Sequence, residues 1–440
     1  MDTLVQAAQL LLSLSILVIL HEFGHYIPAK IFKTRVEKFY LFFNPWFSLF
    51  KKKIGETEWG IGWLPLGGFV KISGMIDESM DKEQMALPPQ PWEFRAKPAW
   101  QRLIIMLGGV TVNLILGMFI YAMVVFAYGD KHLKNEDVKY GLTFQEMFQK
   151  YGLNNGDKIL KVEGVAVDDV MQINKAIFLR DARNLTVQHV DGSISEVKLP
   201  AEVHKEMFQK DGFNSFRPRT PIIIDSVIPE SAAGKAGLTT EDKILAVNGE
   251  KVQFFDEITA VLIKSKNQTI DMLVQNGDST RNISVSVDSV GHLGFINEHY
   301  LNIYKITDVH YSFGASFAHG ISKGWWTVKD YVSQFQFVFT KKGASSIGGF
   351  GTIGKLFPTT WDWETFWLNT AFISIVLAFM NILPIPALDG GHVVFLLYEI
   401  ITGKEAPQKV LEVAQYVGFI ILITLLLYAN GSDLFRWITG

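Results

Sequence analysis

Four long apolar stretches interrupt an otherwise mixed chain. They run from Leu4 to about Ile27, from Leu103 to Tyr128, from Phe366 to Leu383 and from Val413 to Ala429. A helix of about 20 mostly apolar residues can cross a bilayer, and the second stretch contains no charged residue. The third stretch runs into Pro384 and Pro386, where a helix has to stop or unwind. The pattern therefore predicts a polytopic α-helical membrane protein with four transmembrane helices.

Lysine and arginine indicate how these helices are oriented. Basic residues are frequent between the first and second stretches, including the run Lys51 to Lys53, whereas none precedes the first stretch. Because short cytoplasmic segments of membrane proteins are enriched in Lys and Arg, this segment is predicted to be cytoplasmic. Both termini and the long region from Gly129 to Phe357 would then face the other side of the membrane.

A short β-structure is predicted inside the cytoplasmic segment. Residues 58–73 alternate loosely around the sequence Pro65-Leu66-Gly67-Gly68. This pattern predicts a strand, a glycine turn and a second strand, and Trp59, Trp63 and Phe69 would suit a β-hairpin at the membrane surface. A small soluble loop with ordinary turn glycines is an equally open alternative.

The region between the second and third stretches contains an internal repeat. Residues Gly152 to Gly164 recur, with substitutions, as Gly237 to Gly249, which begins 85 positions later. That period is the size of a small domain. Each copy contains a glycine turn, an Asp that can bind turn amides, and an Ile-Leu-x-Val strand closed by another glycine turn. The repeat predicts two tandem copies of one α/β module.

Both copies resemble PDZ domains in the arrangement found in bacterial proteases. The stretch Ser231-Ala232-Ala233 strengthens this resemblance for the second copy, and the first copy lacks it. PDZ domains bind extended peptides by adding a strand to a sheet edge, so the resemblance implies peptide binding. For either copy the alternative is a spacer without a ligand.

A helix is predicted after the second module. Residues Phe313 to Thr340 interleave aromatic side chains with Lys and Asp, which is typical of an amphipathic helix. Such a helix would lie on the outer face of the membrane or pack on the modules. A glycine-rich connector, residues 343–354, leads from it to the third apolar stretch.

Composition agrees with a membrane protein that carries a water-soluble part, since 48% of the 440 residues are hydrophobic and 19% are charged. The net charge is -3, and the sequence has no cluster of basic residues next to a nucleic-acid-binding motif, so no nucleic-acid partner is expected. Cysteine is absent. Disulfides and thiolate chemistry are therefore excluded, and any metal must be held by histidine and carboxylate.

The strongest chemical signal is the sequence His21-Glu22-Phe23-Gly24-His25 at the end of the first apolar stretch. Residues four apart share a helix face, so both imidazoles can bind one zinc ion while Glu22 lies beside the water that the metal activates. Strongly polar side chains are costly in a membrane helix and usually mark function. The motif predicts a catalytic zinc site inside the membrane.

A catalytic zinc with two histidines needs a third protein ligand, and Asp389 is the candidate. It lies in the sequence Asn381 to Gly391, where Pro384, Pro386 and two glycines break the third helix at membrane depth. Irregular backbone is tolerated at that depth only where protein or a wet cavity covers it. The alternative is that Asp389 caps the following helix, His392 to Thr402.

These two motifs together resemble the site-2 family of intramembrane metalloproteases. The PDZ-like pair and the sequence Pro65 to Lys71 narrow the resemblance to the regulator-of-sigma-E protease group. The resemblance implies that Zn²⁺ is bound by His21, His25 and Asp389 and that Glu22 is the catalytic general base. It also implies substrate contacts at Asn381, Pro384, Pro386, Gly67, Gly68 and Val70.

The resemblance further implies a multi-pass enzyme of the bacterial inner membrane that cleaves transmembrane segments of single-pass proteins. Its substrates would be anti-sigma factors or remnant signal peptides, already cut once on the outer side. The termini and the PDZ-like pair would be periplasmic, and the pair would act as a size filter that binds peptides or ectodomains. The active site would lie in the lipid bilayer toward the cytoplasm.

Two other functions remain open on the sequence. A membrane-anchored PDZ scaffold with an inactive metal site would need the modules but not Glu22. A zinc transporter would also use intramembrane His and Asp, but it would have no need of peptide-binding modules.

Several positions depart from the family's usual pattern. Val376 stands where members often have a second Asn, and Gly108-Gly109-Val110 replaces a more usual Gly-Pro. Asn113 is interpreted as a helix-packing residue. His392 is interpreted as structural, since a fourth protein ligand would close the position that water needs.

The predicted domain boundaries follow from these assignments. They are the first transmembrane helix (1–32), the cytoplasmic segment with the hairpin (33–100), the second transmembrane helix (101–128), the first PDZ-like domain (129–215), the second PDZ-like domain (216–305), the amphipathic helix and connector (306–362), the third transmembrane segment (363–402) and the fourth transmembrane helix (408–431).

Overall fold

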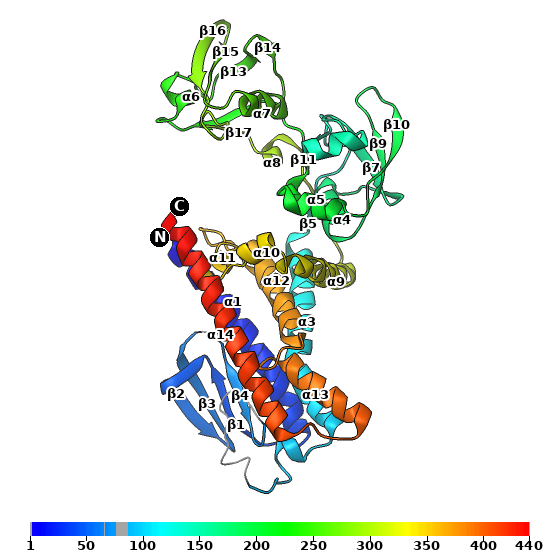
Figure 1. Cartoon of the computed structure of the whole chain (residues 1–440), viewed down its shortest axis with the longest axis vertical. Coiled ribbons are helices and arrows are strands. Elements are labelled where there is room, and N and C mark those ends of the chain that lie inside the picture. Colours follow the sequence, from blue (N-terminus) through cyan, green and yellow to red (C-terminus); the bar gives the residue numbers. More distant parts are fainter. Residues whose placement is uncertain (1, 66, 76–86, 440) are drawn as a thin grey trace. The chain divides into compact units, whose positions relative to one another are not determined.

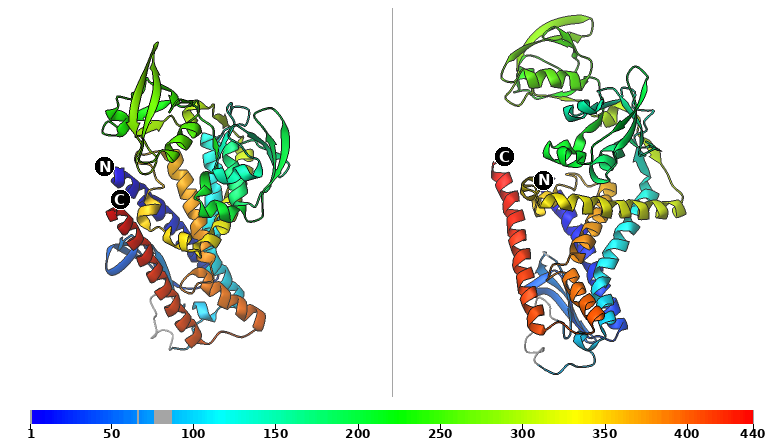
Figure 2. Two further views of the ribbon diagram at one scale, coloured as in Figure 1. Left: turned by 45° about the horizontal axis from the view of Figure 1, so that its top comes forward. Right: turned by 45° about the vertical axis from the view of Figure 1, so that its right-hand side comes forward.

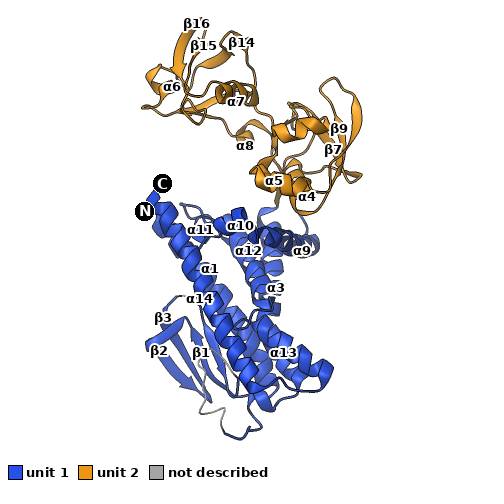
Figure 3. Cartoon of the chain, in the orientation of Figure 1, with its two compact units in different colours: residues 1–129, 310–440 blue, residues 130–309 orange. Residues whose placement is uncertain are grey.

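The computed structural model describes residues 2–65, 67–75 and 87–439. The chain divides into two compact units, one made of residues 1–129 and 310–440 and the other of residues 130–309 (Figure 3). Leu66 of the predicted glycine turn lies outside the described residues. The first unit contains all the long apolar helices, and the second contains the internal repeat.

Among the described residues of the first unit, four helices are long and apolar enough to cross a membrane, as predicted. They are α1 (Asp2–Ile31), α3 (Ala99–Tyr128), α12 (Trp363–Ile382) and α14 (Gln408–Thr439). Each helix begins before its apolar stretch, and α1 and α14 also continue past its end. Within this unit both chain termini lie at one end of the helices (Figure 1), as an even number of crossings requires.

Helix α3 is the centre of the first unit, because it contacts α1, α12, α13 (Asp389–Thr402) and α9 (Phe313–Val338). Its crossing with α1 is very close. A β-carbon on Gly24 of α1 would lie 2.5 Å from the carbonyl oxygen of Gly108 on α3. Lipid gives helices no hydrophobic reason to associate, so small residues that let backbones approach are what holds such a crossing together.

A four-stranded sheet lies at the end of the first unit opposite the termini (Figure 1). Its strands are β1 (Val36–Leu41), β2 (Phe43–Ile54), β3 (Thr57–Leu64) and β4 (Phe69–Ile72), in the order β2-β3-β1-β4. Strand β1 runs parallel to β3 and antiparallel to β4. The two strands predicted on either side of the glycine turn therefore exist, but the hairpin between them is wrong.

The buried strand β1 separates those two strands for a steric reason. Tyr40 of β1 is fully buried and lies opposite Gly60 of β3. A β-carbon on Gly60 would be 2.3 Å from the Tyr40 ring, so glycine at this position makes room for it. The hairpin of this sheet is instead formed by β2 and β3, which are consecutive and antiparallel.

Helix α9 confirms the predicted amphipathic helix and packs on α3 and α12. It runs across the direction of the long helices (Figure 2). Its buried face carries Ser316, Gly320 and Gly324, spaced four residues apart. A β-carbon on Gly320 would lie 2.4 Å from the backbone of Ala122, so this face is a small-residue helix contact. The short helices α10 (Lys341–Ser345) and α11 (Phe350–Gly354) follow.

The second unit contains two modules with the same sheet order. The first has β6 (Leu142–Phe144), β7 (Lys158–Val162), β8 (Val165–Ala166), β9 (Asn184–Gln188), β10 (Ile194–Lys198), β11 (Phe216–Pro218), α4 (Ile173–Leu179) and α5 (Val203–Gln209). The second has β12 (Ile224–Val227), β13 (Lys243–Val247), β14 (Glu250–Lys251), β15 (Thr269–Asn276), β16 (Ser279–Ser286), β17 (Phe295–Asn297), α6 (Ala232–Lys235), α7 (Phe255–Lys264) and α8 (Tyr300–Ile303). The orders are β10-β9-β7-β8 and β16-β15-β13-β14.

The repeat predicted from the sequence is confirmed down to details of register. Strands β7 and β13 occupy equivalent positions in the repeat. The pairing of β7 with β9 and that of β13 with β15 each contain a register shift between the second and fourth residues of β7 or β13. The unit is closed at its ends by β5 (Asp130–His132), which pairs with β18 (Thr307–Val309). Its first and last residues therefore lie side by side.

The Asp of each repeat binds turn amides, as predicted. Asp157 accepts a hydrogen bond from the Asn154 backbone N–H at 2.9 Å, and Asp242 accepts one from Thr239 at 2.8 Å. Burial alone would raise the pKa of Asp242, but the Thr239 hydrogen bonds and the Arg281 guanidinium hold that pKa below its usual value.

The modules differ at one strand edge. In the first module, the amide of Asn174 on α4 holds the backbone of β11, since it accepts from the Phe216 N–H at 3.0 Å and donates to the Phe216 oxygen at 2.6 Å. Thr259 is the residue 85 positions further on, and its hydroxyl donates to the Phe255 oxygen of its own helix instead. Only the first module therefore has, at this helix position, a side chain that occupies the backbone hydrogen-bonding groups of the neighbouring strand.

Candidate metal centre

Helix α1 supplies two imidazoles and one carboxylate to the candidate site. His21 and His25 lie one turn apart, and their Nε2 atoms are 3.2 Å from each other. The Nδ1 atom of His25 lies 2.9 Å from the carbonyl oxygen of Ile105 on α3. A nitrogen that faces a carbonyl carries the proton, so Nε2 keeps the lone pair that a metal needs.

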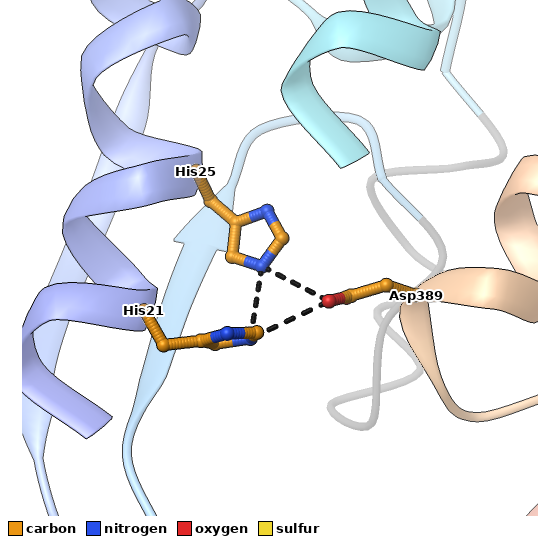
Figure 4. A group of neighbouring side chains, drawn as sticks. All are labelled: His21, His25 and Asp389. Carbon is orange, nitrogen blue, oxygen red and sulfur yellow. Dashed lines mark hydrogen bonds and ion pairs between the residues drawn. The ribbon is translucent and has the colours of Figure 1, made fainter. Parts of the chain in front are cut away.

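A broken helix brings Asp389 to the same place. Helix α12 ends at Ile382 and α13 begins at Asp389, so the residues between them form the bend that Pro384 and Pro386 predict. The N-cap position of α13 is Leu388, and Asp389 is the first helical residue. The alternative in which Asp389 serves as a helix cap is therefore wrong, because its carboxylate points away from its own helix and toward α1 (Figure 4).

Close backbone contacts fix the bend. A β-carbon on Gly390 would lie 2.2 Å from the Leu383 carbonyl oxygen, so only glycine lets α13 start beside the bend. Ala387 has a φ of 76°, which is a strained value for a residue with a side chain. Its N–H donates to Oε1 of Gln415 on α14 at 3.2 Å. The strained conformation is therefore held from a neighbouring helix.

Three donor atoms converge between α1 and α13. Oδ2 of Asp389 lies 3.4 Å from Nε2 of His21 and 3.4 Å from Nε2 of His25. Figure 4 shows the two imidazoles and the carboxylate pointing at one another. All three donor atoms lie within 4.8 Å of each other, which is the separation that one shared ion requires.

The residues present fit a zinc ion. Oδ2 of Asp389 is buried and has no conventional hydrogen-bond partner within the described part of the chain, and a buried polar atom without a partner is costly unless something satisfies it. Two imidazoles and one carboxylate are a donor set typical of catalytic zinc. Gly109 keeps the space open, since a β-carbon there would lie 2.4 Å from Nε2 of His25.

The site opens into a cavity of about 910 Å³ within the first unit. Its lining includes all three donor residues together with Glu22, which is 9% exposed. Val70 of β4 lines the same cavity, and a β-carbon on nearby Gly68 would lie 3.6 Å from Cγ of Glu22. A buried carboxylate therefore lies between the candidate metal site and the edge of the sheet.

The predicted substrate-contact residues divide into two groups. Asn381, Gly67, Gly68 and Val70 all line the cavity, and Nδ2 of Asn381 lies 3.4 Å from Nε2 of His21. Pro384 and Pro386 form the bend instead, and neither is among the residues that line the cavity. A substrate contact stays a prediction for the first group, and the geometry gives the two prolines a role in shaping the bend.

Sequence reasoning missed two residues of the site. Asn113 of α3 was expected only to pack helices, but its side chain lies 3.1 Å from Nδ1 of His21. Gly109 was noted only as a departure from a pattern, although a side chain there would collide with both imidazoles. One sequence feature could have indicated them: the polar Asn113 lies one turn after Gly109 in the most apolar of the four long helices, where a polar side chain usually marks function.

Comparison with known proteins gives an independent finding. Peptidase family M50 matches residues 9–425 of the chain. The chain is 24% identical to the regulator of sigma E protease of Haemophilus influenzae, over 97% of this chain and 98% of that protein. It is 25% identical to protease RseP of Yersinia pestis, over 99% of this chain and 100% of that protein. The chain therefore belongs to peptidase family M50, whose members are zinc-dependent membrane metalloproteases.

Proposed function

We propose that this protein cuts peptide bonds inside the transmembrane segments of single-pass proteins, with zinc held by His21, His25 and Asp389. The observation that carries the proposal is the convergence of these three donors with Glu22 on one cavity inside the set of long apolar helices. An inactive scaffold would have no reason to keep a buried carboxylate beside three converging metal-donor side chains.

The side chains have separate tasks in the proposed reaction. Bound zinc lowers the pKa of water and polarises a carbonyl group. The carboxylate of Glu22 takes the proton from the attacking water and passes it to the nitrogen of the leaving amine. The carbonyl of Ile105 keeps the proton of His25 on Nδ1, so this imidazole can serve as a ligand.

The substrate is proposed to bind as an extended strand. A membrane helix hides its carbonyl oxygens in its own hydrogen bonds, so a substrate has to unwind before it can be cut. Strand β4 is an edge strand of the sheet, and its residue Val70 lines the cavity together with Glu22. A strand added beside β4 would place its carbonyl groups next to that carboxylate. Gly68 supports this arrangement by its position, because a β-carbon on it would be within van der Waals contact of the Glu22 side chain, at 3.6 Å.

The proposed setting is a bacterial inner membrane, with the sheet and the metal centre toward the cytoplasm and the termini and repeated modules in the periplasm. The Lys and Arg residues between the first two spans support this orientation. The proposed substrates are anti-sigma factors or remnant signal peptides that have already lost their outer domain.

The two repeated modules are proposed to be PDZ-like domains, residues 129–215 and 216–305, that act as a size filter. Their shared sheet order and their matching turns support common ancestry of the two copies. Asn174 closes the edge of β11 in the first module. This difference favours the second module as the one with an available strand edge for a peptide.

Removing the modules is expected to let untrimmed substrates be cut. Because His132 pairs with Thr307, residues 133–306 can be replaced by a two-residue Asn-Gly turn that closes β5 and β18 as a hairpin. The reconstituted variant should cleave a single-span substrate with its folded outer domain still attached, at a rate within about threefold of that for the trimmed substrate.

The control is the intact protein, which should cut only the trimmed form. If the shortened protein cuts the trimmed substrate and still refuses the untrimmed one, the modules are not the filter.

A further inference from the structure

A fully buried amide lies behind the candidate metal centre. Asn113 in the middle of α3 is 1% exposed, and its Nδ2 lies 3.1 Å from Nδ1 of His21. Its Oδ1 is also buried and has no hydrogen-bond partner among the described residues. Its backbone oxygen accepts a hydrogen bond from Oγ of Ser374 on α12 at 2.7 Å. The backbone of Asn113 thus holds helices together, but its side chain is aimed at His21.

The hydrogen-bond partners of this side chain conflict with metal binding as they stand. If Nε2 of His21 gives its lone pair to a metal, the proton of the neutral ring is on Nδ1. An N–H at Nδ1 needs an acceptor, and the amide nitrogen of Asn113 is a donor. Two donors would then face each other at 3.1 Å, while the acceptor of the same amide has no partner.

Reversing the Asn113 amide removes both faults at once. The nitrogen and oxygen of an amide have nearly the same size, so a half-turn exchanges them without moving other atoms. Oδ1 would then accept the Nδ1–H of His21, and the buried oxygen would gain a partner. The second histidine already shows this arrangement, because Nδ1 of His25 faces the carbonyl oxygen of Ile105 on the same helix.

We propose that Asn113 is a positioning residue of the metal centre, whose side-chain oxygen holds the proton of His21 on Nδ1 and aims Nε2 at the zinc ion. Helix α3 then orients both imidazoles, one with a backbone carbonyl and one with a side-chain amide. The inference rests on the proposed function, because it needs His21 to be a zinc ligand.

The test measures zinc affinity of the purified full-length protein by competition with a chelator. Asn113→Leu, which has a similar size and no acceptor, is expected to weaken zinc binding about 10- to 100-fold, the usual cost of losing such a partner. Asn113→Ala lacks the acceptor without adding bulk and should behave alike. Asn113→Asp keeps an acceptor at the same place and should bind zinc within about threefold of the wild type.

Ser374→Ala is the matched control, because it removes the hydrogen bond between Ser374 and the Asn113 backbone but leaves the side chain in place. It should lower the melting temperature and leave zinc affinity unchanged. Wild-type zinc affinity in the Leu and Ala variants would overturn the proposal, and so would an equal loss in the Asp variant.

Failure of the proposed function would look different. In that case His21→Ala itself would bind zinc as tightly as the wild type does. A large loss in His21→Ala together with no loss in Asn113→Leu would refute only the role of Asn113.

Discussion

Glu22→Gln is expected to slow cleavage of a trimmed single-span substrate by at least about 100-fold while one zinc ion per chain stays bound. Glutamine has nearly the same shape as glutamate but cannot accept a proton, and general base catalysis typically contributes 10²- to 10⁴-fold. The three donor atoms come from other residues, so the metal has no reason to leave. Zinc content and cleavage rate are measured on the same reconstituted sample.

Glu56→Gln provides the matched control for this change. Glu56 belongs to the same unit, its side chain is 64% exposed, and its ion pair with Lys30 is 3.9 Å long. Exposed pairs of this kind contribute little, so the control should cleave at the wild-type rate. Cleavage by Glu22→Gln at that same rate would refute the assignment of Glu22 as the general base.

Gly109→Ala is expected to abolish zinc binding and, with it, cleavage. The added β-carbon would lie 2.4 Å from Nε2 of His25 and 2.5 Å from Cε1 of His21. Contacts that short force both rings away from the position where they can share an ion. We expect zinc affinity to fall by more than about 100-fold, which exceeds the usual effect of losing a supporting hydrogen bond. Chelator competition measures the affinity.

Gly117→Ala separates this effect from general damage to helix packing. It lies on the same helix, and its β-carbon would be 2.6 Å from Cγ1 of Ile375, so the crowding is similar but remote from the metal centre. The Gly117 variant should lose stability and keep its zinc. If Gly109→Ala binds zinc as tightly as the wild type, the metal does not lie between these two histidines.

The long helices and the two halves of the site could be predicted from the sequence because their signals are local. An uncharged apolar stretch is sufficient to indicate a span, and the four-residue spacing of His21 and His25 places both rings on one helix face. Asp389 could be predicted for a similar reason, since the prolines and glycines around it mark a break in an apolar helix. The 85-residue repeat could be found by comparing the sequence with itself.

The order of the membrane sheet could not be predicted in the same way. Two strands joined by a glycine turn normally form a hairpin. Here β1 lies between β3 and β4, and Gly60 of β3 leaves the room that the Tyr40 ring of β1 needs. Such a fit between distant side chains leaves no periodic trace in the sequence. The same holds for Asn113, whose contact with His21 depends on where α1 crosses α3.

Anomalous diffraction at the zinc edge from crystals of the full-length protein tests the central claim most directly, because it locates the bound ion. The predicted result is one zinc peak per chain, about 2.0–2.2 Å from Nε2 of His21, Nε2 of His25 and a carboxylate oxygen of Asp389. A zinc ion bound by other residues, with these three side chains left free, would contradict the account.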